Sequence, residues 1–572
     1  MIYRKFVSKA LISRLSPTAL CQSAKLARRG TAIVIAMVFA NISIAAEVDN
    51  KLNIIEPAKT SACYLDGMSE QLQCGKISVP ENPQKPDGKH IDIHFAILPA
   101  IKDTHPNEAL LAIAGGPGQS AIEHAASFDR LLSKVRQQRD ILLIDQRGTG
   151  QSHILNCEDS TVTSMLAFDD ENIDVIAETE KCLAQIDADI TQYGSETALT
   201  DFEAVRAYLG YQKLHLYGIS YGTRMAQLYM RHYPEALATV TLDGVVPMQQ
   251  SVLAIGGAIE RGFELLMRDC ASNTACQAQY PDLLADFTTV NKRLSEKAIS
   301  QNVRDPQTNE PSTLLLTRSK FTGAIRMGLY TPAIRALLPH AIHQAAKEDY
   351  QPIMGIYTLS SDGLGLAIGM HSSVVCGEDI HRISDQMRKD AKESYISASM
   401  IEGLEKTCEV WKIPPVKDTF SEPIRSDLPT LLLSGELDPA TPPNWGALAQ
   451  TEMTNAKHFI SPFATHGVAA QTCANDLIAD LVDSGSVKNL DASCLQKDVR
   501  RSFYLNANTV EPLTVATKSN VEDNATATPA AENTVDMVKE TAADNVTGSV
   551  IDNSTDNVIN NATDNATSTG KE

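Results

Sequence analysis

The stretch KLHLYGISYGTRMAQLYMRH, Lys213 to His232, places an apolar run, a glycine-flanked serine and a helical segment in direct succession. Lys213 to Tyr217 is typical of a buried strand, and Thr223 to His232 of a helix. Between them, the glycines of GISYG at residues 218–222 permit a sharp, strained turn. This order predicts that Ser220 is a nucleophile held at the tip of a strand, near the positive end of a helix.

Short apolar runs on either side of this stretch indicate the fold class. Runs of this length are typical of strands buried on both faces of a parallel sheet. Phe202, Val205 and Leu209 recur at helical spacing, as in a crossover helix. The chain is therefore expected to be α/β, with a mostly parallel central sheet. The other expected strands are His90 to Leu98, Ala109 to Ala114, Asp140 to Ile144, Ala238 to Leu242, Thr430 to Leu433 and Lys457 to Ile460.

The sheet pattern is interrupted between residues 251 and 425, where helical stretches replace strand-like runs. This predicts a helical cap over the edge at which open α/β sheets bind ligands. A low-complexity segment rich in Asp-Asn units ends the chain and is expected to be disordered. The expected organisation is a signal peptide over 1–46, the first part of the core over 47–250, the cap over 251–425, the second part of the core over 426–507 and the disordered tail over 508–572.

The first 46 residues are basic, then apolar, then small, which is the order of a secretory signal peptide. An uncleaved amphipathic anchor is the alternative. Loss of the seven Lys and Arg residues of this segment would change the formal net charge from −20 to −27. That acidity argues against a nucleic-acid partner and fits an exported protein, periplasmic or extracellular. No stretch after the signal is long and apolar enough to cross a bilayer, and the oligomeric state stays open.

Ten cysteines remain after the signal, an even number that suggests disulfides in an exported chain. Sequential pairing is the simplest of many connectivities. No Cys or His cluster has the spacing of a zinc site, so neither a metal nor another cofactor is expected. The sequential pairs are Cys63 with Cys74, Cys157 with Cys182, Cys270 with Cys276, Cys376 with Cys408, and Cys473 with Cys494.

A nucleophilic serine needs a base, and the base needs an orienting acid. On this type of sheet the chain order is serine, acid, histidine. Asp438 follows the strand-like run at 430–433 and is the candidate acid, with Glu436 as its rival. His466 lies in the next such loop and is the candidate base, whereas His458 lies inside a strand-like run and is expected to be structural.

Acyl transfer also needs hydrogen-bond donors for the oxyanion that forms. One expected donor is the backbone N–H of Tyr221, directly after the nucleophile. The other is the backbone of Gly116, in the glycine-rich loop GGPG at residues 115–118 that follows an expected strand.

Three motifs together resemble the proline iminopeptidase and tripeptidyl aminopeptidase family of serine exopeptidases. They are GGPG at 115–118, DQRGTG at 145–150 and GISYGTR at 218–224, and the stretch from Pro429 to Trp445 resembles the tripeptidyl branch. The resemblance extends from about Cys63 to Cys494. It implies the α/β-hydrolase fold, the triad Ser220, Asp438 and His466, and a supporting role for residues 145–150.

Two further points come from the resemblance. Proline iminopeptidases usually have a histidine before the double glycine, where this chain has Ala114, which favours the tripeptidyl branch. An aminopeptidase must also bind a free ammonium group with a sheltered carboxylate. Glu378 and Asp379, directly after Cys376 and Gly377, are the candidates that the family pattern suggests; two solvated surface acids are the alternative.

The sequence therefore predicts an exported serine exopeptidase that removes one to three residues from the N-termini of peptide substrates through an acyl-enzyme. A carboxylesterase or another small-molecule hydrolase would share the whole triad and is the alternative.

Overall fold

The computed structural model describes residues 59–512, apart from 158–165, 306–307, 362–364 and 398–399. The predicted signal peptide and most of the predicted disordered tail lie outside the described residues.

A nine-stranded sheet forms the centre of the fold, with the order β1-β2-β3-β5-β4-β6-β7-β10-β11. The strands from β5 to β11 in this order are parallel, and β1, β2 and β3 pair antiparallel at one edge. The predicted mostly parallel α/β sheet is therefore confirmed. The strands are β1 (Ser61–Cys63), β2 (Leu72–Pro80), β3 (His90–Leu98), β4 (Glu108–Ile113), β5 (Asp140–Ile144), β6 (Lys213–Ile219), β7 (Leu237–Asp243), β10 (Thr430–Gly435) and β11 (Ala456–Ser461).

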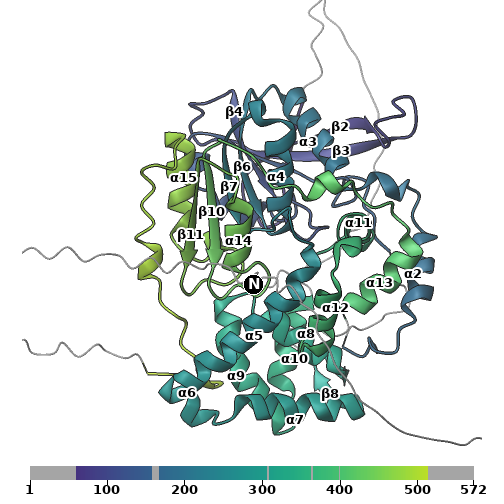
Figure 1. The fold of residues 1–572 in the computed structure, drawn as a ribbon, viewed down its shortest axis with the longest axis vertical. Helices are drawn as coiled ribbons and strands as arrows, with labels where there is room; N and C mark the ends of the chain where they lie inside the picture. Colours follow the sequence, from purple (N-terminus) through teal and green to yellow (C-terminus); the bar gives the residue numbers. More distant parts are fainter. Residues whose placement is uncertain (1–58, 158–165, 306–307, 362–364, 398–399, 513–572) are drawn as a thin grey trace, which may run out of the picture. The chain divides into compact units, whose positions relative to one another are not determined.

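Helices cover both faces of the sheet, so its central strands are buried along nearly their whole length (Figure 1). In β4, Leu111 and Ile113 face one apolar core and Leu110 faces the other. Helices α3 (Ser195–Leu209), α4 (Tyr221–His232) and α14 (Pro443–Gln450) pack in the first core. Helices α1 (Ala125–Leu131) and α15 (Ala474–Ser484) pack in the second.

A mainly helical cap is inserted between β7 and β10 and has an apolar core of its own (Figure 1). In this core the ring of Phe287 stacks on that of Phe321 and lies at a tilt against that of Phe263. Helix α2 (Val175–Leu183), which precedes the cap in the chain, packs against its last helix. The cap helices are α5 (Ile255–Ser272), α6 (Thr274–Gln279), α7 (Leu283–Glu296), α8 (Arg318–Gly328), α9 (Pro332–Ala346), α10 (Gln351–Ser361), α11 (Ile368–Val374), α12 (Asp385–Glu393) and α13 (Met400–Trp411).

The cap departs from its prediction by containing a hairpin of two strands, β8 (Ile299–Arg304) and β9 (Pro311–Leu316). The expectation of helical stretches alone was wrong here. In β8 only Ile299 and Val303 are apolar, so the strand has almost no alternation of apolar and polar residues by which a sequence reveals a strand.

The C-terminal limits also differ from the prediction. Phe503 is buried in the cap's core, and the Tyr280 hydroxyl donates a hydrogen bond to the carbonyl oxygen of Tyr504 at 2.8 Å. Strand β13 (Thr509–Val510) then pairs with β12 (Tyr504–Asn506). Residues 503–510 thus continue the folded chain past the predicted start of the tail at residue 508.

Five disulfides are present in the described part of the chain, and they join the cysteines in the expected sequential order. Cys63 is bonded to Cys74 at the edge of the sheet, where β1 pairs with β2. The other bonds join Cys157 to Cys182, Cys270 to Cys276, Cys376 to Cys408, and Cys473 to Cys494. The simplest of the connectivities that the sequence left open is therefore the one observed.

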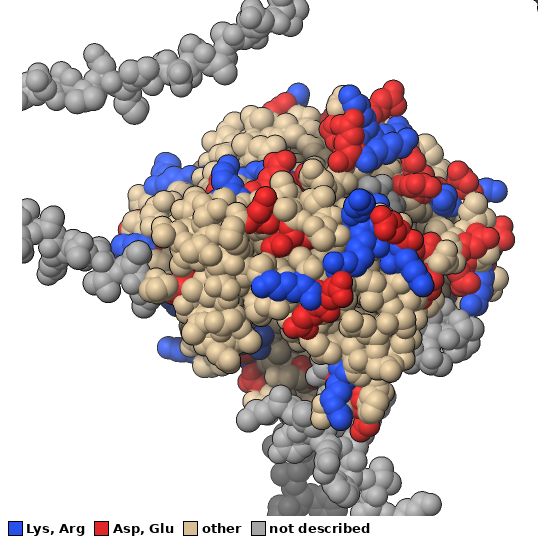
Figure 2. Space-filling view, turned by 90° about the horizontal axis from the view of Figure 1, so that it is seen from below, with Lys and Arg blue, Asp and Glu red and all other residues tan. Residues whose placement is uncertain are grey.

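In the described part of the chain, no helix combines the length and the hydropathy that a bilayer span requires. Figure 2 shows acidic and basic side chains interspersed on the face seen from the cap side.

Candidate active site

Ser220 lies at the sharp turn between β6 and α4, with φ 56° and ψ −126°. This is a left-handed backbone conformation that costs free energy in a residue other than glycine. A Cβ atom at Gly218 would clash with the carbonyl of Gly222, and one at Gly222 would clash with that of Ile113. The two glycines of the motif are therefore needed for this turn to pack against the end of β4.

The glycine-rich loop after β4 lies directly against Ser220. A Cβ atom at Gly115 would be 3.1 Å from the Cβ atom of Ser220. Gly116 and Gly118 have φ of 107° and 112°, which only glycine adopts readily. Tyr221 is the first residue of α4, so its backbone N–H has no acceptor within the helix.

The structure brings His466 and Asp438 together. His466 Nδ1 lies 2.9 Å from Oδ2 of Asp438, whose side chain is fully buried in the loop after β10. Oδ1 of Asp438 accepts the backbone N–H groups of Ala440 and Thr441 at 2.7 and 2.9 Å. These bonds hold the carboxylate with Oδ2 toward the imidazole.

Burial by itself would lower the pKa of His466, but the charge and hydrogen bond of Asp438, together with the charge of Asp243, raise it above its ordinary value. The protonated imidazole is therefore stabilised in this position. A base that transiently becomes an imidazolium benefits from this stabilisation.

Ser220 and His466 line one cavity of about 890 Å³, which lies between the carboxyl ends of the central strands and the cap. Among the described residues no hydrogen bond joins the Ser220 hydroxyl to His466. Such bonds are often long before a substrate is bound. The cap side of the cavity includes Arg326, Tyr330 and His371. No Asp or Glu is among the described residues that line it.

The rival residues named from the sequence lie elsewhere. Glu436 forms an ion pair with Arg261 of α5, and among the described residues no hydrogen bond or ion pair joins it to His466. His458 lies in β11, and its Nε2 is 2.9 Å from the Ser434 hydroxyl. Burial lowers the pKa of His458, which fits the structural role that the sequence suggested.

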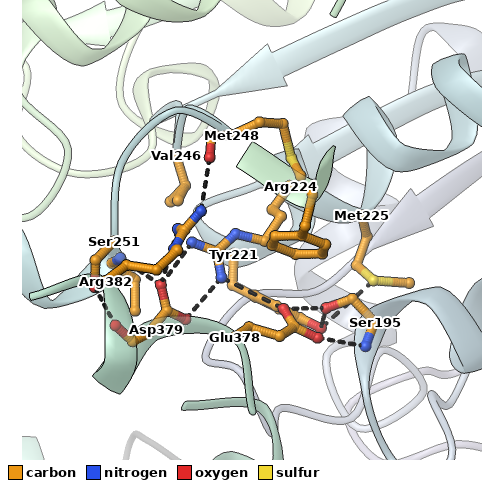
Figure 3. A network of polar contacts seen from close by, with 12 residues as sticks. Ser195, Tyr221, Arg224, Met225, Val246, Met248, Ser251, Glu378, Asp379 and Arg382 are labelled. Carbon is orange, nitrogen blue, oxygen red and sulfur yellow. Dashed lines mark hydrogen bonds and ion pairs between the residues drawn. The ribbon is translucent and has the colours of Figure 1, made fainter. Parts of the chain in front are cut away.

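Glu378 and Asp379 lie in a π-helical turn, Val375–Asp379, and both are buried (Figure 3). Asp379 accepts hydrogen bonds from both terminal nitrogens of Arg224, at 2.7 and 2.9 Å. Glu378 accepts the backbone N–H and the hydroxyl of Ser195 at 2.6 and 2.8 Å. Neither carboxylate lines the cavity. The interpretation of the pair as solvated surface acids is therefore wrong, and the ammonium-binding role stays a prediction that this geometry does not favour.

The net pKa shifts of the two carboxylates are opposite, although Arg224 lowers the pKa of both. Burial raises the pKa of Glu378 to about 7, since Arg224 compensates it only in part. Burial would also raise the pKa of Asp379, but the close guanidinium of Arg224 lowers it below its ordinary value. The pair belongs to a polar network that the Ser195 hydroxyl joins to the hydroxyl of Tyr221, the residue directly after Ser220, at 2.6 Å (Figure 3).

The loop at residues 145–150 supports the chain next to the glycine-rich loop, in line with the supporting role that the resemblance implied. Asp145 Oδ1 accepts the Ser120 hydroxyl at 2.6 Å and the backbone N–H of Ile122 at 3.1 Å. Arg147 is buried and pairs with Asp201 at 2.7 Å. The bonds of Asp145 fix the chain directly after the glycine-rich loop, and the Arg147 ion pair joins residues 145–150 to α3.

Three residues near His466 were missed by sequence reasoning. The Thr441 hydroxyl donates to Asp438 Oδ2 at 2.8 Å and lies 3.2 Å from His466 Nδ1. The Tyr330 ring packs edge-on against the imidazole, with centroids 5.2 Å apart. Asp243, at the end of β7, accepts the backbone N–H of Val468 at 2.7 Å. The sequence contained signals for two of them: Thr441 lies three residues after Asp438, and Asp243 is a carboxylate at the end of an apolar run. It contained no signal for Tyr330.

Comparison with known proteins adds a second line of evidence. Residues 393–494 match a family model described as TAP-like protein. Serine protease Hip1 of Mycobacterium tuberculosis is 24% identical over 459 residues, which cover 74% of this chain and 87% of that protein. Tripeptidyl aminopeptidase of Streptomyces lividans is 25% identical over 200 residues, which cover 32% of this chain and 37% of that protein.

The chain is a hydrolase with the α/β-hydrolase fold, and its sequence is similar to a serine protease and to tripeptidyl aminopeptidases. Among solved structures similar to this hydrolase is the proline iminopeptidase of Mycobacterium smegmatis, at 12% identity and a TM-score of 0.32, covering 72% of this chain and 98% of that one. An esterase of Thermogutta terrifontis is similar at 13% identity and a TM-score of 0.32, covering 72% and 99%.

Proposed function

We propose that this hydrolase is an exported serine exopeptidase that cleaves peptide bonds near free N-termini through an acyl-enzyme on Ser220. The observation that carries the proposal is the shared cavity of Ser220 and His466, with Asp438 hydrogen-bonded behind the imidazole. The similarity to a tripeptidyl aminopeptidase and to a serine protease supports a peptide as the substrate.

In the proposed reaction Ser220 Oγ attacks the carbonyl carbon of the scissile bond, and its proton passes to His466 Nε2. The backbone N–H groups of Gly116 and Tyr221 stabilise the oxyanion, each contributing about 3–4 kcal/mol. His466 then protonates the leaving amine as the C–N bond breaks. Water then attacks the carbonyl carbon of the acyl-enzyme and gives a proton to His466. The ester bond to Ser220 Oγ breaks, which releases the acid, and the same proton returns from His466 to Ser220 Oγ.

Two features of the structure support cleavage near the ends of peptide chains and export of the protein. The cap covers the carboxyl ends of the central strands. The cavity of about 890 Å³ below it accommodates a few residues of a peptide rather than a folded protein. Five disulfides are typical of proteins in oxidising compartments, which supports the periplasm or the extracellular medium as the location.

A carboxylesterase is the second candidate, and one observation favours it. No carboxylate is among the described residues of the cavity, so a substrate ammonium group would find no anionic partner there. An ester substrate needs no such partner.

The decisive assay compares chromogenic peptides of one to three residues, with free and acetylated N-termini, against a simple ester. Exopeptidase action predicts that acetylation lowers kcat/KM by tenfold or more. Equal turnover of free and blocked peptides, or turnover of the ester alone, would assign the enzyme to the esterases. Ser220→Ala must abolish all activities, and a fluorophosphonate probe must label the wild type but not this variant.

A further inference from the structure

Arg326 of α8 has an unusual position among the described arginines. It is partly buried and lines the cavity that contains Ser220 and His466. Its Nε is buried without a hydrogen-bond partner, and its Nη1 approaches the sulfur of Met400 at 3.8 Å. In the described part of the chain no carboxylate forms an ion pair with it.

The other arginines buried from solvent are neutralised. Arg224 pairs with Asp379 at 2.7 Å, Arg147 with Asp201 at 2.7 Å and Arg335 with Asp269 at 2.6 Å. A partly desolvated charge without a counter-ion is costly, because burial removes hydration that nothing replaces. Among the described residues, Arg326 is therefore a partly buried guanidinium without an ion-pair partner, and it lies in the cavity of Ser220 and His466.

The guanidinium also lies close to the reaction centre. Tyr330, four residues beyond Arg326, packs its ring against the His466 imidazole at 5.2 Å. Burial raises the pKa of the Tyr330 hydroxyl, and the nearby charge of Arg326 opposes this effect. On another wall, His371 Nδ1 lies 3.1 Å from the carbonyl oxygen of Pro117 in the glycine-rich loop. The charge of Arg326 reaches His371 as well, adding to the effect of burial in lowering its pKa.

We propose that Arg326 binds a carboxylate of the substrate and determines specificity for it. A guanidinium pairs with a carboxylate through two parallel hydrogen bonds, and the absence of Asp and Glu from the described lining leaves no internal competitor. The carboxylate comes either from an acidic side chain or from the C-terminus of a short peptide. This inference rests on the proposed hydrolysis at Ser220 and adds the charge class of the substrate.

The test measures kcat/KM for matched substrates that differ by one charge. One pair has Glu or Gln in the residue next to the scissile bond, with an amidated C-terminus. The other is a short uncharged peptide with a free or an amidated C-terminus. In the wild type one carboxylate substrate is favoured over its amide by about ten- to a hundredfold, as expected for a hydrogen bond to a charged group. The favoured pair identifies the source of the carboxylate.

Arg326→Met is expected to reduce that ratio to near one, and Arg326→Lys to retain part of it, because an ammonium cannot form the two parallel bonds. Arg268→Met, an exposed position on α5 outside the cavity, is the matched control and keeps the wild-type ratio. Arg130 lines the cavity as an exposed residue hydrogen-bonded to Ser127, and is the rival.

Three results would overturn the inference: no charge preference in the wild type, an unchanged ratio in Arg326→Met, or loss of the ratio in Arg130→Met instead. Fluorophosphonate labelling of Ser220 separates these from failure of the proposed function. If Ser220→Ala keeps its activity, the proposed mechanism fails. If Ser220 is labelled normally and no ratio depends on Arg326, the mechanism stands and the specificity assignment fails.

Discussion

Asp243 accepts the backbone N–H of Val468 at 2.7 Å, which joins the end of β7 to the loop that carries His466. Its other oxygen accepts the N–H of Ala469 at 2.9 Å and the Tyr217 hydroxyl at 2.8 Å. Strand β7, in the first part of the core, thereby fixes the loop of His466, which follows it in the chain by more than two hundred residues. We therefore expect this carboxylate to fix the position of the imidazole.

Asp243→Ala is expected to lower kcat by about tenfold or more, since a small displacement of a catalytic group is costly. The loss of buried acceptors is also expected to reduce the free energy of unfolding by about 1–3 kcal/mol. Steady-state kinetics and urea denaturation measure the two effects. Unchanged kcat in a destabilised variant would show that Asp243 supports the fold but does not position His466.

Asp438→Asn is expected to lower kcat by about 10⁴-fold, because an amide favours the wrong imidazole tautomer. Glu436→Gln is the matched control, since Glu436 lies in the same loop but pairs with Arg261. It is expected to keep wild-type kcat. The opposite result, a large loss in Glu436→Gln alone, would make Glu436 the orienting acid.

The pH dependence of kcat/KM follows from His466. Only the neutral imidazole accepts the Ser220 proton, and the pKa of His466 is raised above its ordinary value of 6.5. Activity is therefore expected to rise with pH, with an apparent pKa above 6.5 in the free enzyme. An acid limb with its midpoint well below that value would contradict the assignment of His466 as the base.

Glu378 predicts a pH dependence of stability rather than of chemistry. Its folded pKa of about 7 is raised above its ordinary value of 4.5, so the folded state binds the proton more tightly. Its contribution to stability is present below pH 4.5 and is lost as pH rises to about 7. Glu378→Gln should therefore gain stability relative to the wild type between pH 5 and pH 8, by on the order of 2 kcal/mol, measured by urea denaturation.

Asp379→Asn is the contrasting variant, because it removes the closest charge partner of buried Arg224. Loss of one partner of a buried ion pair costs about 3–5 kcal/mol. Where the variant folds, the ratio of kcat/KM for free and acetylated peptides should match the wild type. A selective loss of preference for free N-termini would instead support this carboxylate as an ammonium ligand.

The sequence predicted those parts of the molecule that are determined by residues close together in the chain. The strand, turn and helix around Ser220 follow from local spacing, and the resulting α/β-hydrolase fold is confirmed. The partners of Glu378 could not be predicted, because Ser195 and Arg224 are brought to it only by tertiary packing. Arg326 likewise gains significance only from what surrounds it. The assignment of roles to Ser220, Asp438 and His466 stays a prediction that the variants above test.

The burial of Phe503 in the cap's core has a consequence for biosynthesis and for engineering. Leu166, which precedes the insertion in the chain, is also buried in this core. The cap is therefore assembled from three separate segments of the chain: the insertion itself and the segments around Leu166 and Phe503. In the export proposed above, the cap could not be completed until nearly the whole folded region had crossed the membrane. For the same reason, transplanting residues 251–425 alone onto another scaffold would leave exposed gaps where those two side chains belong.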